Sequence, residues 1–190
     1  ILKKSRTCIK SDLYIETEKI MDLDKIRWKS EVSHPNFIAQ YRFVKAKRLC
    51  EYWANKNKLL YLFARMRYEH YKVKYNTDIP ARCKIGGGFK IRHLGGIVFN
   101  PGVEIGKNVD CLNGVLLGQI DFGAKAGVPR IGDNVFLGTN SIVVGKVQIG
   151  NDVLIAPGAY VNFDVPEHSI VIGNPGRIIA KENATRGYIA

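Results

Sequence analysis

Glycine is absent from the first 85 residues of this 190-residue chain and is frequent afterwards, with sixteen of the nineteen glycines between Gly86 and Gly158. Glycine weakens helices and suits tight corners. This contrast predicts a basic α-helical subdomain at 1–77 and a turn-rich domain at 78–180. We expect the C-terminal tail, 181–190, to be frayed from Glu182 onward.

Metal-binding and disulfide patterns are also missing. The four cysteines, Cys8, Cys50, Cys83 and Cys111, show no CxxC spacing, which argues against a zinc site and a disulfide framework. No metal is therefore expected. No apolar run approaches the roughly 20 residues of a membrane-spanning helix, and no signal peptide is evident. These absences predict a cytoplasmic protein with reduced thiols.

Positive charge is concentrated in the helical part. Residues 1–77 hold 18 Lys and Arg against 8 Asp and Glu, whereas the remainder holds 11 against 9. Such a surplus suits an anionic membrane, nucleic acid or an acidic glycan, or it is simply a solvated helix surface. From these alternatives we keep peripheral contact with an anionic membrane, and we expect no nucleic-acid partner.

A six-residue repeat dominates the second half. Branched aliphatic residues recur every six positions in two series, Ile85, Ile91, Ile97, Val103, Val109 and Val115, then Ile131, Leu137, Val143, Ile149, Ile155 and Val161. This period predicts a mainly β chain, a left-handed parallel β-helix in which three short strands form a coil of roughly 18 residues. Small and polar residues between the repeats suit corners that need positive φ: Gly86, Gly102, Asn108, Gly114, Gly132, Gly138 and Gly150.

Three helices are expected before the repeat. The first covers 11–29 with Ser11 as N-cap, and the second starts at Ser33-His34-Pro35 and ends near Asn55. Its apolar stripe contains Phe37, Tyr41, Val44, Leu49 and Trp53. A third, antiparallel helix carries the stripe Leu59, Leu62, Phe63, Met66 and His70. We expect both stripes to lie in the core.

The interval between Val115 and Ile131 breaks the repeat and predicts an extruded loop from Gln119 to Pro129. This loop, the Asp78-Ile79 pair, the run IRHLGGIV from Ile91 to Val98 and the closing Gly-Asn-Pro-Gly-Arg together resemble the serine acetyltransferases over roughly 33–180, and also their branch in polysaccharide biosynthesis. The resemblance implies transfer of acetyl from acetyl-CoA to a hydroxyl. It also implies a homotrimer with sites between neighbouring β-helices, and a dimer of trimers through the helices.

Site residues follow from the same resemblance. His93 matches the catalytic histidine, which as a general base removes the hydroxyl proton; the alternative is a structural corner histidine. Asp78 matches the aspartate that orients it, or else is a turn residue. Gly118, Thr139, Ala156, Pro157, Pro175 and Arg177 match the acetyl-CoA groove, although each also suits a plain corner. His34 and His70 are interpreted as structural, and His168 as mainly so.

Two positions depart from the family. Arg92 replaces the aspartate before the catalytic histidine, and Val128 replaces a loop histidine; in the family both groups help to hold serine. We therefore expect Arg92 to bind the acceptor and to disfavour the ammonium of serine, so that a sugar hydroxyl of a surface polysaccharide is preferred. The alternatives are serine O-acetylation for cysteine biosynthesis and a non-catalytic trimeric scaffold.

Overall fold

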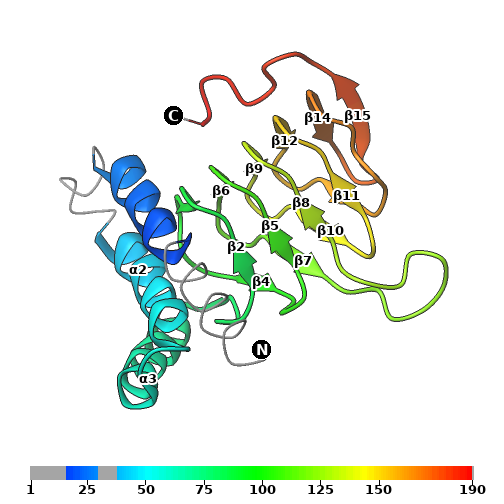
Figure 1. Cartoon of the computed structure of the whole chain (residues 1–190). Coiled ribbons are helices and arrows are strands. Elements are labelled where there is room, and N and C mark those ends of the chain that lie inside the picture. Colours follow the sequence, from blue (N-terminus) through cyan, green and yellow to red (C-terminus); the bar gives the residue numbers. More distant parts are fainter. Residues whose placement is uncertain (1–15, 30–37, 190) are drawn as a thin grey trace, which may run out of the picture.

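The computed structural model describes residues 16–29 and 38–189, in which three helices pack against one end of a parallel β-helix of about five turns (Figure 1). The helices are 16–28, α2 (Ile38–Trp53) and α3 (Lys58–Lys74). Of the helices in these ranges, none is long and apolar enough to cross a membrane. The predicted caps at Ser11 and Ser33-His34-Pro35 lie outside the described residues, as does Phe37.

Short strands stack into three sheets, one on each face of the β-helix. Sheet 1 contains β1 (Thr77–Asp78), β4 (Ile97–Phe99), β7 (Leu116–Gly118), β10 (Ile142–Val144) and β13 (Tyr160–Val161). Sheet 2 contains β2 (Lys84–Ile85), β5 (Glu104–Ile105), β8 (Arg130–Ile131) and β11 (Gln148–Ile149). Sheet 3 contains β3 (Lys90–Ile91), β6 (Asp110–Cys111), β9 (Phe136–Leu137), β12 (Val153–Ile155), β14 (Ser169–Ile172) and β15 (Arg177–Ala180). Only the β14–β15 pair of these strands is antiparallel.

All twelve residues of the six-residue repeat point into the β-helix and are at most 4% exposed, which confirms the predicted fold. The strands also bury a second residue two positions away, such as Phe89 beside Ile91 and Phe99 beside Ile97. The inward positions thus come in pairs. The six-residue repeat passes from the second residue of one pair, Ile91, to the first residue of the next pair, Ile97. Five residues lie between Ile91 and Ile97, whereas three lie between Cys111 and Val115, the two residues stacked on them in the next coil. The corner after β3 is therefore two residues longer than the corner stacked on it.

Close stacking of the coils, more than backbone conformation, explains the corner glycines. Of the seven residues expected to need positive φ, only Asn108 (+54°) and Gly114 (+70°) adopt it, so that expectation was wrong for the other five. At Gly86, Gly132 and Gly150 an added Cβ would lie only 2.5 to 2.7 Å from atoms of the next coil. Glycine is required there because the coils approach too closely for a side chain.

Replacing Gly132 with alanine is expected to lower the free energy of unfolding by about 1–3 kcal/mol, the usual cost of overpacking. The new methyl would lie 2.7 Å from the Gly150 carbonyl oxygen, so two coils must separate. Thermal denaturation measures the effect. Gly102→Ala is the matched control, because its nearest neighbour is a side-chain methyl of Val128 at 3.2 Å. Equal melting temperatures for the two variants would contradict this account.

The α3 helix presents the opposite face from the one expected. Tyr68 is fully buried, its ring lies 5.2 Å from that of Phe43 on α2, and its hydroxyl donates to the Ile79 carbonyl at 2.6 Å. The predicted apolar stripe, Leu59, Leu62, Phe63, Met66 and His70, is exposed. The expectation that this stripe lies in the core was therefore wrong. On α2, Val44 is buried and Tyr41, Leu49 and Trp53 are partly buried.

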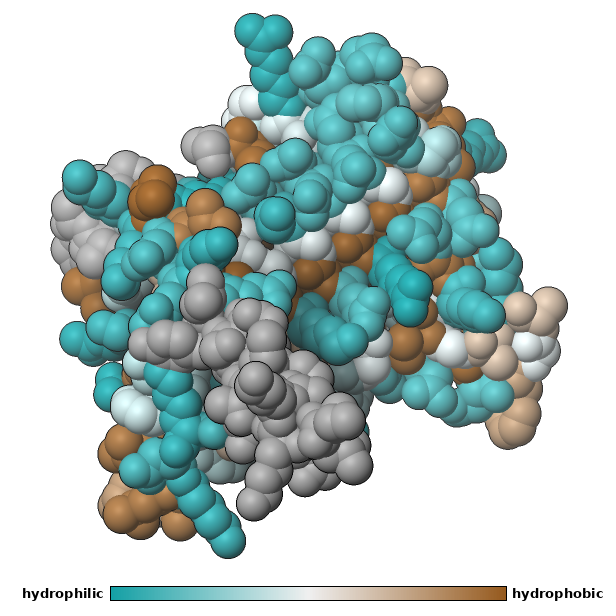
Figure 2. Space-filling view, viewed as in Figure 1, coloured by the Kyte–Doolittle hydropathy of each residue, from teal (hydrophilic) through white to brown (hydrophobic). Residues whose placement is uncertain are grey.

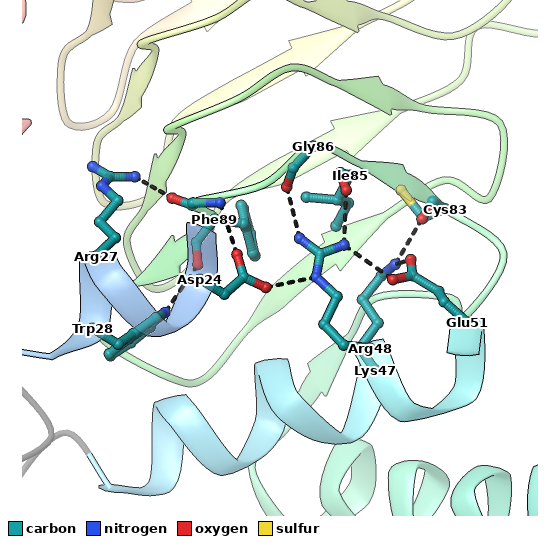
Figure 3. Close-up of polar contacts among 11 residues, drawn as sticks. Asp24, Arg27, Trp28, Lys47, Arg48, Glu51, Cys83, Ile85, Gly86 and Phe89 are labelled. Carbon is teal, nitrogen blue, oxygen red and sulfur yellow. Dashed lines mark hydrogen bonds and ion pairs between the residues drawn. The ribbon is translucent and has the colours of Figure 1, made fainter. Parts of the chain in front are cut away.

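A buried arginine joins the helices to the first coil (Figure 3). Arg48 on α2 is 1% exposed and donates to the carbonyl oxygens of Ile85 at 2.7 Å and Gly86 at 2.6 Å. It also pairs with Asp24 at 2.7 Å and Glu51 at 3.0 Å. Burial raises the pKa of Asp24, and the adjacent guanidinium opposes that rise. This first coil has no coil beneath it, so its carbonyls need such donors.

Two further side chains serve the same edge of the first coil. Lys47, 1% exposed, donates to the Cys83 carbonyl at 2.8 Å, and the Trp28 indole donates to the Phe89 carbonyl at 3.1 Å. The helices therefore cap the β-helix through polar contacts as well as apolar packing. The hydrophobic core is also continuous across residue 77.

The C-terminal segment after β15 packs against sheet 3, so the predicted fraying from Glu182 was wrong for the described residues. Ala184 is 3% and Thr185 6% exposed, and the Tyr188 ring lies 5.0 Å from that of Phe136 on β9. Residues 181–189 thereby run back across the outer surface of the sheet toward the helices (Figure 1).

Candidate active site

His93 lies on the enlarged corner between β3 and β4, and its side chain is exposed. Within the described residues its imidazole makes no hydrogen bond or ion pair. Neighbouring backbone holds the corner in place: Gly96 N–H donates to the Asn76 carbonyl at 2.6 Å, and Gly95 N–H donates to the Thr77 hydroxyl at 3.3 Å. The imidazole is therefore presented to solvent from a well-supported loop, with both nitrogens available to a substrate.

Asp78 lies on β1, beside β4 in sheet 1, and its side chain is 61% exposed. Its carboxylate pairs with Lys72 at 2.8 Å. Among the described side chains it makes no hydrogen bond with His93. Its role in orienting that histidine stays a prediction.

Arg92 points toward sheet 3. Its Nε donates to the buried Asp110 carboxylate at 2.6 Å, and its terminal nitrogen donates to the Tyr188 carbonyl of the C-terminal segment. Arg27 of helix 16–28 binds the same carboxylate. Asp110 is 0% exposed and was not identified from sequence, because an aspartate in a two-residue strand carries no distinctive pattern. The guanidinium of Arg92 is thus held by the protein itself, and its expected contact with the acceptor stays a prediction.

Four corners stack on the edge where sheet 3 turns into sheet 1, which we call the His93 edge (92–96, 112–114, 138–140 and 156–158). Gly114 N–H donates to the Gly95 carbonyl at 2.9 Å, and Gly158 N–H donates to the Thr139 carbonyl at 2.9 Å. This stacking places Thr139, Ala156 and Pro157 in one column above His93.

The turn before β15 continues the column. Gly176 N–H donates to the Tyr160 carbonyl at 2.9 Å, and Tyr160 N–H donates to the Gly173 carbonyl at 3.0 Å. Pro175 and Arg177, both exposed, lie in and just after this turn. Most residues predicted for the acetyl-CoA groove therefore share the His93 edge.

Gly118 and the extruded loop lie on a different edge. Gly118 ends β7, and the loop from Gln119 to Pro129 projects from the β-helix as predicted (Figure 1). A bridge between Ile120 and Gly127 closes its base, and Val128 lies against Gly102. Since sheet 1 strands start at the His93 edge and end at this loop, the width of a sheet separates the two halves of the predicted site within one chain.

Asp152 anchors the C-terminal segment. Its carboxylate accepts bonds from the N–H groups of Ala184 and Thr185, both at 3.0 Å, from the Thr185 hydroxyl at 2.7 Å and from His168 Nδ1 at 2.8 Å. Burial disfavours ionisation of Asp152, but the bonds from Thr185 and His168 outweigh it and lower its pKa to about 2. The same bond raises the pKa of His168. The contacts of His168 are structural.

The Asp152–His168 pair is expected to stabilise the fold most between about pH 4 and pH 6.5, the ordinary pKa values of the two groups. The lowered carboxyl pKa contributes stability that is lost as pH falls toward 2, and the raised imidazole pKa contributes stability that is lost as pH rises through it. The melting-temperature difference between the unmodified chain and Asp152→Asn should therefore peak in this window. Asp121→Asn, in the extruded loop, is the control. A pH-independent difference would contradict the prediction.

A cavity of about 610 Å³ lies between the helices and the first coil, lined by residues including Cys50, Tyr61, Arg65, Cys83 and Ile85. None of the predicted site residues lines it. Burial raises the pKa of the Cys50 and Cys83 thiols to about 11. In the described ranges, no three His, Cys, Asp or Glu side chains are grouped as metal ligands.

Comparisons with known proteins agree with the observed fold. Residues 129–162 match the model of the bacterial transferase hexapeptide (six repeats). Serine acetyltransferase 4 of Arabidopsis thaliana is 30% identical over 174 residues, which cover 90% of this chain and 47% of the relative. The chain thus spans about half the length of the curated relatives it matches.

Solved structures share the fold. A serine acetyltransferase from Brucella abortus superposes with a TM-score of 0.72 at 24% identity, covering 90% of this chain and 71% of that one. A serine acetyltransferase in complex with CoA gives 0.70 at 23% identity, covering 89% and 73%. These relatives bear the name serine acetyltransferase, and they do not support the polysaccharide branch. The chain is therefore a hexapeptide-repeat β-helix protein similar in sequence and fold to serine acetyltransferases.

Proposed function

We propose that this chain is an acetyl-CoA-dependent O-acetyltransferase with His93 as its general base. The observation that carries the proposal is the exposed imidazole on the enlarged corner, at the foot of the column that holds Thr139, Ala156 and Pro157. Similarity to serine acetyltransferases over 90% of the chain supports the reaction type.

The reaction needs one base and no change of oxidation state. His93 takes the proton of the acceptor hydroxyl while its oxygen attacks the acetyl carbonyl carbon of the thioester. The C–S bond of the resulting tetrahedral intermediate breaks, and the CoA sulfur leaves with the proton from the imidazolium. The products are the O-acetyl ester and CoA, and no metal is needed.

L-Serine is the acceptor that the relatives favour, in place of the sugar hydroxyl expected from sequence. The sugar argument rested on the positive charge of Arg92, and Asp110 binds that guanidinium at 2.6 Å. A sugar hydroxyl remains the second candidate because Val128 gives the loop an apolar side chain, packed on Gly102, where serine acetyltransferases place a histidine.

Release of the CoA thiol, assayed with L-serine and in parallel with nucleotide sugars and glycans, tests both candidates. We expect a serine kcat/KM of about 10⁴ M⁻¹s⁻¹ or more, within the ordinary enzyme range. A value at least a hundredfold lower, together with turnover of a sugar, would establish the second candidate. No thiol release with any hydroxyl acceptor would contradict acetyl transfer and leave the scaffold hypothesis.

We further propose that the chain functions as a homotrimer whose sites lie between neighbouring β-helices. His93 and the extruded loop lie on different edges of one chain, so a site that contains both needs two chains. Light scattering at micromolar concentration is expected to give three times the chain mass, with roughly 1,600 Å² or more buried per interface. A stable monomer would contradict the proposal.

A further inference from the structure

The α3 helix carries an apolar face that no described part of the protein covers. Leu59, Phe63 and Met66 are each 61% exposed, Leu62 is 54% exposed and Val73 84%. We call these five residues the α3 apolar face. Apolar side chains gather at the end of the molecule where α3 lies (Figure 2). Scattered exposed leucines are ordinary, but a contiguous apolar stripe on one helix marks an interaction surface.

The spacing of these residues makes the face continuous. Leu59, Leu62, Phe63 and Met66 follow intervals of three and four and therefore share one side of the helix. Tyr68, on the packed side, lies against α2 and the first coil. The helix has 17 residues, a length of about 25 Å. The described part of the chain therefore packs α3 through its other side and leaves these side chains uncovered.

Cations flank the α3 apolar face. The helix contains five basic residues and one acidic residue, Glu69, whose carboxylate is already paired with Arg65 at 2.7 Å and Lys72 at 3.1 Å. Lys58, Arg67 and Lys74 are exposed, and they form no ion pair with the described residues.

These charges decide which occupant fits the face. A second copy would bring two basic helices together, and like charges repel across an interface. An anionic bilayer meets both properties at once, because its acyl boundary accepts the apolar face while lysine and arginine side chains reach its phosphates.

We propose that α3 docks in the plane of an anionic lipid bilayer. The α3 apolar face enters the boundary between headgroups and acyl chains, and Lys58, Arg67 and Lys74 bind the lipid phosphates. This peripheral attachment goes beyond the proposed acetyl transfer and does not rest on it, since none of these residues belongs to the His93 edge.

Vesicle flotation of the full chain tests the proposal, with phosphatidylcholine vesicles compared with vesicles that contain 30% phosphatidylglycerol. We expect binding to the anionic vesicles only, reduced at least tenfold by 0.5 M NaCl. Leu62→Ser/Phe63→Ser should reduce binding to the anionic vesicles at least tenfold, because it removes apolar side chains from the α3 apolar face. Lys58→Gln/Lys74→Gln should also reduce this binding at least tenfold, because it removes positive charge. Lys107→Gln/Lys181→Gln, which removes the same charge from the β-helix and the C-terminal segment, is the control and should bind like the unmodified chain.

Sedimentation equilibrium of the same proteins tests whether the α3 apolar face binds a second copy of the chain instead of a bilayer. An assembly twice the size of the trimer that Leu62→Ser/Phe63→Ser breaks, with no vesicle binding, would overturn the proposal and assign the face to a second copy. Equal loss with the Lys107→Gln/Lys181→Gln control would overturn it as well, because binding would then reflect net charge alone. Circular dichroism of every variant checks that the fold is unchanged.

Discussion

Replacing His93 with alanine is expected to lower the rate of acetyl transfer by about 10²–10⁴-fold, the usual contribution of a general base. The imidazole is exposed on a loop corner and makes no bond to the described residues, so its removal leaves the fold intact. The loss should fall on kcat at saturating acetyl-CoA, because the histidine acts on the acceptor hydroxyl. Thiol release measures the rate.

The exposed His70 on α3 supplies the matched control, since His70→Ala removes an imidazole that does not belong to the His93 edge. It should retain the rate of the unmodified chain. Circular dichroism and light scattering should give the same fold and assembly for both variants. If His93→Ala keeps more than a tenth of the rate on the preferred acceptor, another group is the base and the proposed mechanism fails.

Replacing Arg48 with alanine is expected to lower the free energy of unfolding by about 3–5 kcal/mol. The change strands the buried carboxylate of Asp24 and removes the donors to the Ile85 and Gly86 carbonyls. An unpaired buried charge costs more than the pair contributes, which makes this loss larger than that of a surface arginine. Denaturant unfolding at one fixed protein concentration measures it.

Arg42→Ala on the same helix is the control, because Arg42 is exposed and should change the free energy of unfolding by less than about 0.5 kcal/mol. The double variant Arg48→Met/Asp24→Leu replaces both members of the buried ion pair with apolar side chains. It should therefore recover part of the free energy of unfolding that Arg48→Ala loses. If Arg48→Ala costs less than about 1 kcal/mol, the capping role of these contacts is wrong.

The β-helix was predictable because its core repeats along the sequence. Inward-facing aliphatic residues recur every six positions, and this period is visible in the sequence itself. Residues such as Ile131 and Val143 therefore predict the fold without any knowledge of long-range contacts. The extruded loop was predictable for the same reason, as a break in that period. The two extra residues in the corner at His93 were harder to detect, because they do not interrupt the six-residue repeat. Inward positions come in pairs, and the repeat shifts from the second member of one pair to the first member of the next across this corner.

Orientation of the helices depended on tertiary packing. The stripe that includes Leu62 and Phe63 predicts an amphipathic helix, but it does not say which side faces the core. Tyr68 takes the packed side because its ring fills the space against Phe43 while its hydroxyl satisfies the Ile79 carbonyl. That carbonyl lies eleven residues away in sequence, beyond any helical periodicity.

Sequence alone therefore determined the architecture and the residues of the His93 edge, because both follow from local period and motif. Only the tertiary structure decided the partners of the charges. Arg92 was expected to bind the acceptor, and no contact was predicted for Arg48. In the structure Arg48 donates to carbonyls of the first coil, and Arg92 donates to Asp110 of the next coil. Such partners come from segments 18 to 38 residues away, and hydrogen bonds over that separation depend on how the coils and helices stack.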